Sequence, residues 1–354
     1  MPAKQRAVVI CPGRGTYNAQ EWGYLTKNHG NKPDLLNRFD QYRRDQGQPS
    51  LTELDSETPF SMKTHTRGDH ASSLIYGCSI GDFKDIDRDQ YDIVAITGNS
   101  MGWYTSLAAA GALTDLDGLH LVNTMGRLMH ENMIGGQLIY PWFDNDWHPQ
   151  WDARQRYLDL AANFREQGLG ETHLSIDLGG MLVFGADTQG LKNLTRELPQ
   201  QDRFPMRLHN HAAFHTPLQQ PVRAIAREPL SKAPFRAPNI PMIDGRGHIW
   251  TPWSTDPAAL WDYTLGHQLT EAYDFTAAIK VAAREFAPDK LIILGPGTTL
   301  GGAVAQSLIV SNWLDMDSKR AFKERQDAQK LLCAMGNEEQ RGDAVRPESE
   351  KVGD

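Results

Sequence analysis

The fold is decided by residues 91–113, which read YDIVAITGNSMGWYTSLAAAGAL. An apolar run of strand length leads into the glycine-rich string GNSMG, and an alanine-rich helical pattern follows it. A strand, a sharp turn and a helix around a serine form a nucleophile elbow, which presents the serine hydroxyl to an open cleft. The glycines on either side suit such a turn because a Cβ atom would be crowded there. Ser100 is therefore a candidate nucleophile, and a plain glycine-rich turn with a helix-capping serine is the alternative.

Short apolar runs alternate with longer helical patterns along most of the chain, which is typical of an α/β protein with a largely parallel sheet. The expected strands are 7–11, 91–97, 207–211 and 290–294. Between 133 and 207 the order of elements becomes βαββαβ, the order of a ferredoxin-like unit. We therefore expect a discontinuous large domain, residues 1–132 and 208–315, with a small subdomain, residues 133–207, inserted into it.

The C-terminal region, residues 316–354, is expected to contain a charged helix and a tail. The helical pattern runs from 315 to 335. Residues 336–354 contain almost nothing apolar, so we expect them to be disordered.

Composition excludes several classes of protein. The chain has 354 residues, with 36 Lys and Arg against 44 Asp and Glu, and this net charge of −8 argues against a dedicated DNA or RNA binder. Cys11, Cys78 and Cys333 form no CxxC pair, which fits a reducing cytoplasm and predicts neither disulfides nor a zinc site. No apolar run approaches the roughly 20 residues that cross a bilayer, and the run before Pro12 is too short for a signal peptide. We expect a cytoplasmic protein with no membrane partner.

A nucleophilic serine needs a base, and His215 is the candidate. It lies in AAFHTPLQQP, just past an expected strand and at the opening of a proline-containing loop. His209 and His211 would face the same way on that strand, so the three histidines are also a candidate metal cluster. No carboxylate or fourth ligand follows at suitable spacing, and we expect no metal.

The loop CPGRGTY, residues 11–17, follows the first expected strand. Backbone amides near Arg14 are free to point into the cleft, and with the amide of Met101 they would give an oxyanion two donors. A phosphate-binding loop or a plain turn is the alternative, although GRG lacks the spacing and the lysine of a Walker loop.

Five strings occur in an order that resembles the malonyl-CoA:acyl carrier protein transacylase family, which includes the acyltransferase domains of polyketide synthases. They are PGRG at 12–15, GNSMGWYTSLAAAGAL at 98–113, AFHTPLQ at 213–219, the pair Gln268 and Leu269, and GPGTTL at 295–300. The resemblance covers residues 7 to 310. It implies a hydrolase-like large domain with a ferredoxin-like insert.

The resemblance also implies the chemistry. Ser100 would be the nucleophile and His215 the general base and acid of a Ser-His dyad. The backbone amides of Arg14 and Met101 would bind the oxyanion, and the backbone carbonyl of Gln268 would orient the histidine. The serine would take an acyl group from acyl-CoA, and the phosphopantetheine thiol of an acyl carrier protein would then remove it. No bound cofactor is implied.

One departure from the family bears on the substrate. Malonyl-selective members carry an arginine in an LVxxRG string, a bidentate partner for the malonate carboxylate, and here the string is LVNTMG with Met125 in that place. A neutral methionine favours an uncarboxylated acyl group, because burying an unpaired carboxylate costs several kcal/mol. Arg127 lies too far round the helix to substitute. Arg14 and Arg67 remain candidate partners, which keeps malonyl open.

The substrate pocket is expected to include Met125, Phe214, Asn99 and Trp103. Asn99 and Trp103 stand where the family has histidine and glutamate. Arg14 stands where the family has glutamine, a change that leaves the backbone donor intact. The Trp-rich stretch 140–151 is either part of an acyl pocket or lid, or ordinary packing.

A carrier protein is usually acidic, so a chain with a net charge of −8 needs a local basic face to attract it. The segment 221–238 contains Arg223, Arg227, Lys232 and Arg236 against Glu228 alone, and it is the candidate docking surface; a solvated basic helix is the alternative. We expect a monomer that binds acyl-CoA and acyl carrier protein and no nucleic acid. An acyl-thioester hydrolase of the same fold and a non-catalytic scaffold that binds carrier proteins stay open as other functions.

Overall fold

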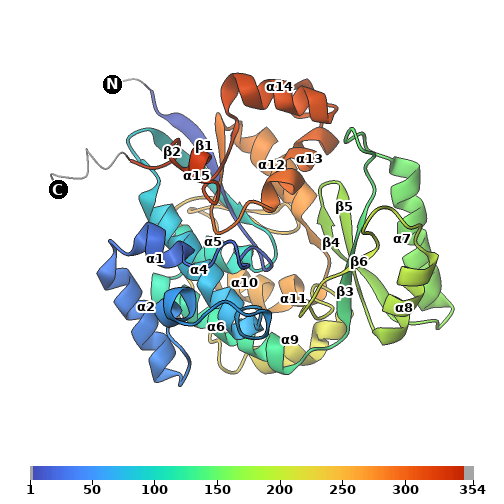
Figure 1. Ribbon diagram of the computed structural model, residues 1–354, viewed down its shortest axis with the longest axis horizontal. Coiled ribbons are helices and arrows are strands. Elements are labelled where there is room, and N and C mark those ends of the chain that lie inside the picture. The colour runs from blue at the N-terminus through green and yellow to red at the C-terminus, as the bar shows by residue number, and fades with distance from the viewer. Residues whose placement is uncertain (1–2, 347–354) are drawn as a thin grey trace.

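The computed structural model describes residues 3–346, which form two sheets surrounded by helices (Figure 1). The strands of the large sheet are, in spatial order, β11 (Leu332–Ala334), β10 (Lys290–Ile293), β1 (Gln5–Cys11), β2 (Tyr91–Gly98), β7 (Met242–Ile243) and β8 (Ile249–Trp250). All neighbours are parallel except β7 and β8. The last five residues of β1, AVVIC, are buried without interruption, as expected of a central strand in a parallel sheet.

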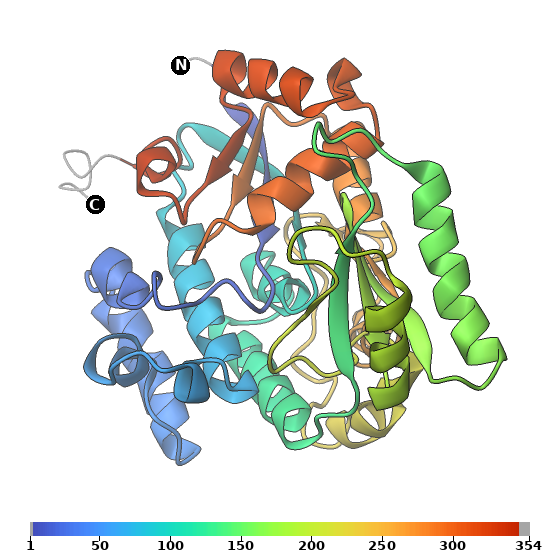
Figure 2. The same cartoon turned by 45° about the vertical axis from the view of Figure 1, so that its right-hand side comes forward.

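The small sheet stands beside the large one (Figure 2). Its strands are, in spatial order, β6 (Met206–Arg207), β3 (Gly136–Pro141), β5 (Met181–Ala186), β4 (Thr172–Leu178) and β9 (Tyr273–Asp274). The chain from β3 to β6 runs βαββαβ and forms an antiparallel sheet, so the predicted ferredoxin-like insert is confirmed. β9 comes from outside this unit and pairs in parallel with β4.

The helices are α1 (Tyr24–His29), α2 (Pro33–Asp45), α3 (Met62–His65), α4 (Gly68–Asp85), α5 (Gly102–Ala109), α6 (Asp115–Glu131), α7 (Trp151–Glu166), α8 (Thr188–Glu197), α9 (Gln220–Ala226), α10 (Pro257–Asp262), α11 (Gln268–Thr270), α12 (Phe275–Phe286), α13 (Leu300–Val310), α14 (Lys319–Gln329) and α15 (Glu338–Arg341). Short turns of other helix types are η1 (Glu53–Glu57), η2 (Pro217–Gln219), η3 (Tyr263–His267) and η4 (Trp313–Asp315). α5 packs on β1 and β2, while α7 and α8 cover the small sheet. No helix within residues 3–346 is long and apolar enough to span a membrane.

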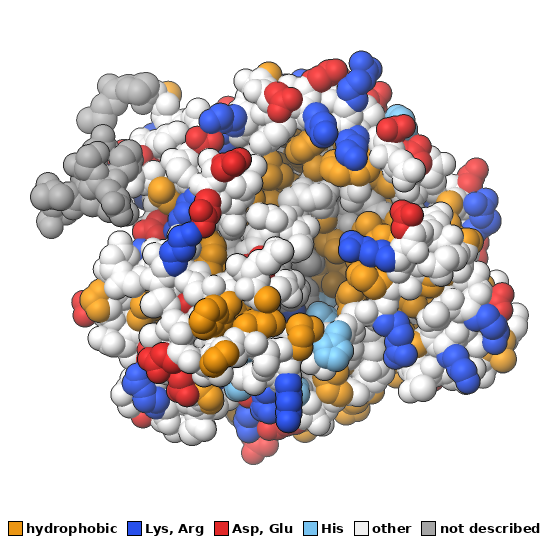
Figure 3. Space-filling view, in the orientation of Figure 1, with side chains coloured by type: hydrophobic (Ala, Val, Ile, Leu, Met, Phe, Trp, Pro, Cys, Tyr) orange, Lys and Arg blue, Asp and Glu red, His pale blue; other side chains and the backbone are white. Residues whose placement is uncertain are grey.

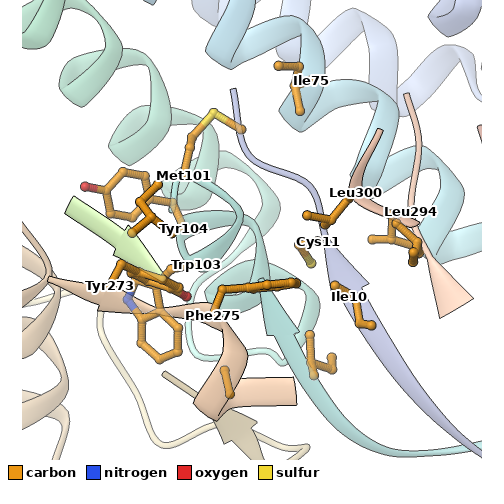
Figure 4. Packing of buried hydrophobic residues seen from close by; sticks show 14 of the residues in the cluster. Ile10, Cys11, Ile75, Met101, Trp103, Tyr104, Tyr273, Phe275, Leu294 and Leu300 are labelled. Carbon is orange, nitrogen blue, oxygen red and sulfur yellow. The ribbon is translucent and has the colours of Figure 1, made fainter. Parts of the chain in front are cut away.

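The core behind the Ser100 turn contains large aromatic side chains (Figure 4). Trp103 and Phe275 are completely buried, and Tyr104 and Tyr273 are nearly so. The three cysteines are also buried, without disulfides. The turn that carries Ser100 therefore rests on a tightly packed base.

The strand expected at 207–211 is shorter than predicted and does not join the large parallel sheet. Only Met206 and Arg207 form a strand, and it pairs with β3 at the edge of the small sheet, as expected of the last strand of the insert. Asn210 has a φ of 55°, a left-handed conformation that cannot continue a strand. The boundaries of the subdomain, at 133 and 207, fall between α6 and β3 and at the end of β6, and we propose them as the division of the chain.

The C-terminal prediction is also wrong in part. The helix expected from 315 to 335 is α14 alone, which ends before Lys330, a residue with a φ of 48°. The apolar run that follows needs burial, and it forms β11 beside β10. Residues 336–346, expected to be disordered, contain α15 and the buried Ala344. Residues 347–354 of the predicted tail lie outside the described part of the chain.

Candidate active site

The parallel pairing of β1 and β2 brings two loops together. Cys11 and Gly98 are partners at the carboxyl ends of these strands. The loop 12–17 and the turn 99–101 therefore leave the sheet at the same edge, where α/β proteins bind their ligands. Arg14 is placed beside Ser100 by this register.

The turn around Ser100 has the geometry of a nucleophile elbow. Ser100 has a φ of 54°, a conformation that is strained for a residue with a side chain. A Cβ atom at Gly98 would lie 2.4 Å from the carbonyl carbon of Gly102, and one at Gly102 would lie 2.2 Å from the carbonyl oxygen of Cys11. Both glycines are thus required because the turn is pressed against its own helix and against β1.

Ser100 and His215 are in direct contact. The Ser100 Oγ lies 2.7 Å from His215 Nε2, and His215 Nδ1 lies 2.6 Å from the backbone carbonyl oxygen of Gln268. A carbonyl only accepts hydrogen bonds, so Nδ1 carries the proton and Nε2 accepts from the serine hydroxyl. The Gln268 side chain donates to the Ser100 carbonyl oxygen at 3.2 Å and accepts from the Tyr104 hydroxyl at 2.9 Å.

His215 is held in its neutral form. Burial is the main cause that lowers its pKa, and the nearby His267 lowers it further, while the hydrogen bond to Gln268 opposes them. The pKa of His215 falls to about 4. At neutral pH the ring is therefore free to take a proton from Ser100, which a general base must do.

A cavity opens beside this pair, with about 420 Å³ of space when the part open to solvent is counted. Figure 3 shows a hollow on the face of the molecule between the large and the small sheet, with hydrophobic side chains around it. The cavity is lined by Arg14, Ser72, Ser100, Met101, Tyr104, Val122, Met125, Gly126, Met129, Phe214, His215, Gln268 and Leu269. Its wall is mainly apolar, and α6 contributes four of the thirteen lining residues, Val122, Met125, Gly126 and Met129.

Two predicted pocket residues, Met125 and Phe214, lie on this wall, and two do not. Asn99 lies outside the cavity because its side chain turns back toward Gly13 of the first loop. Trp103 is completely buried in the core, where its Nε1 donates to Thr264 Oγ1 at 3.0 Å. The assignment of these two residues to the pocket is therefore wrong, because a sharp turn sends the neighbours of the serine away from it.

Sequence reasoning missed several wall residues. Val122 and Met129 lie three residues before and four after Met125, so they share its face of α6 and could have been found from helical spacing. Tyr104, Ser72 and Leu269 reach the cavity only through tertiary packing.

The backbone amides of Arg14 and Met101 are available to a ligand. Neither donates a hydrogen bond to another group within residues 3–346, and both residues line the cavity. Met101 also precedes the first turn of α5, where unpaired N–H groups and the helix dipole favour negative charge. The arrangement can stabilise an oxyanion beside Ser100.

The histidines that were an alternative metal cluster, His209, His211 and His215, have other partners or roles. His215 is engaged by Ser100 and Gln268, while His211 Nδ1 contacts the carbonyl oxygen of His209. Across the described residues there is no group of three or more His, Cys, Asp or Glu side chains that could hold a metal ion.

The Trp-rich stretch 140–151 does not reach the Ser100 cavity. Trp142 is buried against Phe143 and Trp151. Phe143 and Trp147 line a second hollow, of about 1180 Å³, which also includes Lys319 of α14.

The predicted docking residues differ in their surroundings. Arg227 pairs with Asp262 at 2.8 Å and stacks on Trp261, and Arg223 is half-buried. Lys232 and Arg236 are exposed, and neither forms an ion pair with a described residue.

Comparisons with known proteins agree with this geometry. No family model matches the chain. A component of the phenolphthiocerol/phthiocerol polyketide synthase of Mycobacterium tuberculosis is 23% identical over 307 residues, which cover 85% of this chain and 19% of that protein. A non-reducing polyketide synthase of Aspergillus niger is 25% identical over 154 residues, covering 42% of this chain and 8% of that protein. The chain thus spans about a fifth or less of the length of these curated relatives.

Solved structures give the same fold. The malonyl-CoA:acyl carrier protein transacylase of Xanthomonas oryzae superposes with a TM-score of 0.73 at 18% identity, over 98% of both chains. An acyltransferase domain of the salinomycin polyketide synthase superposes with a TM-score of 0.69 at 17% identity, over 98% of this chain and 71% of that one. The resemblance inferred from the five motifs is confirmed: the chain has the fold shared by malonyl-CoA:acyl carrier protein transacylases and polyketide synthase acyltransferase domains.

Proposed function

We propose that the chain is an acyltransferase that moves an acyl group from acyl-CoA to the phosphopantetheine thiol of an acyl carrier protein. The observation that carries the proposal is the contact of 2.7 Å between Ser100 Oγ and His215 Nε2, at an elbow that faces a cavity. A scaffold that only binds carrier proteins would have no use for this pair. The name of the similar Xanthomonas oryzae transacylase, which includes both CoA and acyl carrier protein, supports the choice of these partners.

The first step loads the serine. His215 Nε2 takes the hydroxyl proton as Ser100 Oγ attacks the thioester carbonyl carbon, and the amides of Arg14 and Met101 stabilise the resulting oxyanion. The C–S bond then breaks, and the CoA sulfur leaves as a thiol with the proton that His215 returns. The product is an ester of Ser100.

The second step unloads it. His215 takes the proton of the phosphopantetheine thiol, the sulfur attacks the ester carbon, and the C–O bond to Ser100 breaks. The serine recovers the proton from His215, so the dyad returns to its starting state. A hydrolase of the same fold would differ only in using water here.

Two features of the cavity favour different kinds of acyl group. Met125 and the apolar side chains around it fit an uncarboxylated chain, as the sequence suggests. The guanidinium of Arg14, which lines the same cavity, fits a carboxylated one.

The proposal is tested by the mass of the intact protein after mixing with a panel of acyl-CoAs. Wild type is expected to gain the mass of the acyl group. Ser100→Ala is expected to load at less than about one thousandth of that rate, because the nucleophile is gone. Ser231→Ala, at an exposed serine, is the matched control and is expected to load normally.

The fate of the adduct separates the two reactions. Loss of the acyl group only when a carrier protein with its phosphopantetheine thiol is added supports transfer. Loss at the same rate in buffer alone would show a hydrolase. If no acyl-CoA leaves an adduct on the wild type, the proposed enzyme activity is refuted.

A further inference from the structure

The side chain of Arg14 lines the cavity with part of its hydrogen-bonding capacity unused. Nη2 donates to the carbonyl oxygens of Thr66 at 3.2 Å and Asn210 at 3.0 Å, so the guanidinium has a fixed position. Nε and Nη1 are buried and have no acceptor among the described residues. Such buried N–H groups without a partner are rare in folded proteins, and at a cavity wall they indicate a ligand.

The charge of Arg14 has no anionic partner in direct contact among the described residues, although the guanidinium lies over the Phe214 ring, 5.6 Å from its centroid. Asp69, the acid that raises its pKa, is held by Arg67 at 3.1 Å and by its neighbour His70, and makes no hydrogen bond to Arg14. Burial lowers the pKa of Arg14 to about 10, which still leaves it cationic at neutral pH. A buried cation is costly unless an anion pairs with it.

The other arginines near the site do not compete for this role. Arg67 is occupied by Asp69, its side chain is 43% exposed, and it does not line the Ser100 cavity. Arg127, close to Met125 on α6, pairs with Glu131 and also lies outside the cavity. Arg14 is the cationic side chain that this cavity offers among the residues described.

The position of Arg14 limits what the anion is. In the proposed function its backbone amide binds the oxyanion, so its side chain starts beside the reacting carbonyl. The pantetheine arm separates the phosphates of CoA from the thioester, so they would lie well away from a side chain that starts beside the reacting carbonyl. The anion that can reach Arg14 here is part of the acyl group, and a carboxylate matches the donors of a guanidinium.

We propose that the acyl group is carboxylated, as in a short dicarboxylic thioester, and that the Arg14 side chain on the loop after β1 is its specificity-determining partner. The proposal rests on the proposed function. It replaces the uncarboxylated group that Met125 suggests. Met125 remains part of the wall on α6, where the family has its arginine, and the positive charge is instead on the loop after β1.

The test compares the rates at which Ser100 is loaded from malonyl-CoA and from acetyl-CoA, which has the same CoA thioester and lacks the carboxylate. Wild type is expected to load malonyl faster. Arg14→Gln keeps the backbone amide and removes the charge, so malonyl loading should fall about 10- to 100-fold, mainly through KM, while acetyl loading changes less than about 3-fold. Arg127→Gln is the matched control and should keep the wild-type preference.

A wild type that loads acetyl as fast as malonyl, or an Arg14→Gln variant that loses both activities equally, would overturn the assignment and leave the proposed function intact. Failure of every acyl-CoA to load would refute the proposed function instead. If Arg14→Gln does not fold, as judged by circular dichroism, Arg14→Lys decides. It keeps a cation without the planar fork, so malonyl loading should be reduced more than acetyl loading.

Discussion

Ser100 and His215 share an unusual backbone conformation. Their φ angles are 54° and 55°, in the left-handed region that residues with a Cβ rarely adopt. Holding each residue in this conformation costs on the order of 1–3 kcal/mol, and the packing of the surrounding residues must offset that cost. The two strained residues meet at one hydrogen bond, so the strain lies where the orientation of the dyad is set.

The burial of His215 predicts the pH dependence of loading. Because its pKa is lowered to about 4, the histidine stays neutral as the pH falls from 8 to 5, and the rate constant kcat/KM for loading is expected to stay nearly flat over this range. An ordinary histidine, with a pKa of about 6.5, would lose most of its base form by pH 5. The measurement is the rate of adduct formation from pH 5 to 8.

A rate that halves near pH 6.5 would contradict this prediction. The pH profile of kcat/KM reports the pKa of the free enzyme, so the acyl-CoA concentration is kept well below KM.

At the residue scale, the sequence predicts the dyad better than the pocket. Ser100, His215 and Gln268 lie in local strings whose chemistry is recognisable, and the structure brings all three together. Which residues line the pocket depends on where each side chain points. Asn99 and Trp103 lie within three residues of the serine in sequence, but their side chains point away from the cavity. The unpaired Nε and Nη1 of Arg14 could not be inferred without Thr66 and Asn210, which fix the side chain from distant loops.

Among the elements, β11 and α15 could not be predicted from hydrophobic periodicity. The run Leu331 to Met335 continues the apolar spacing of a helix, yet it is an edge strand of the large sheet. A short apolar run is compatible with either element, and the left-handed Lys330 that separates them has no strong sequence signal. β1, β2 and β10 were predictable because helical patterns separate their apolar runs, whereas β7 and β8, of two residues each, were not predicted.

The contact that fixes α15 is a buried ion cluster. Arg341 pairs with Asp82 at 2.5 Å and with Asp85 at 3.1 Å, and His29 lies 3.0 Å from Asp82. Burial alone would raise the pKa of Asp82, but the close contact with His29 and the charge of Arg341 outweigh it and lower the pKa. The cluster ties the C-terminal segment to α1 and α4.

Arg341→Met is expected to reduce the free energy of unfolding by about 3 kcal/mol, because it leaves Asp82 buried with fewer partners. Denaturant unfolding measures this change. Lys27→Met removes the exposed pair with Glu338 between the same two helices, α1 and α15, and should have little effect. Equal stability of Arg341→Met and wild type would show that the cluster does not hold α15.

On the scale of the whole molecule, charge distribution bears on how a carrier protein docks. The net charge of −8 repels an acidic partner, so attraction must be local. Lys232 and Arg236, after α9, are exposed and unpaired among the described residues, which supports the proposed docking surface.

The double variant Lys232→Glu/Arg236→Glu is expected to raise KM for the carrier protein about 3- to 10-fold at low ionic strength, with CoA loading unchanged. The effect should shrink at high salt, since exposed charges are screened. Arg320→Glu/Lys323→Glu makes the same charge change on α14, which Figure 1 places at the opposite end of the molecule from α9. If both double variants weaken transfer equally, net charge rather than this surface governs the encounter.

The pairing of β9 with β4 has a consequence for the order of events during synthesis. The residue that orients His215, Gln268, lies just before β9, and β1 gains its second neighbour only with β10. A chain that emerges from the ribosome N-terminus first therefore exposes Ser100 long before its base is positioned. Ser100 therefore gains the contact with a positioned His215 only after most of the polypeptide has been made.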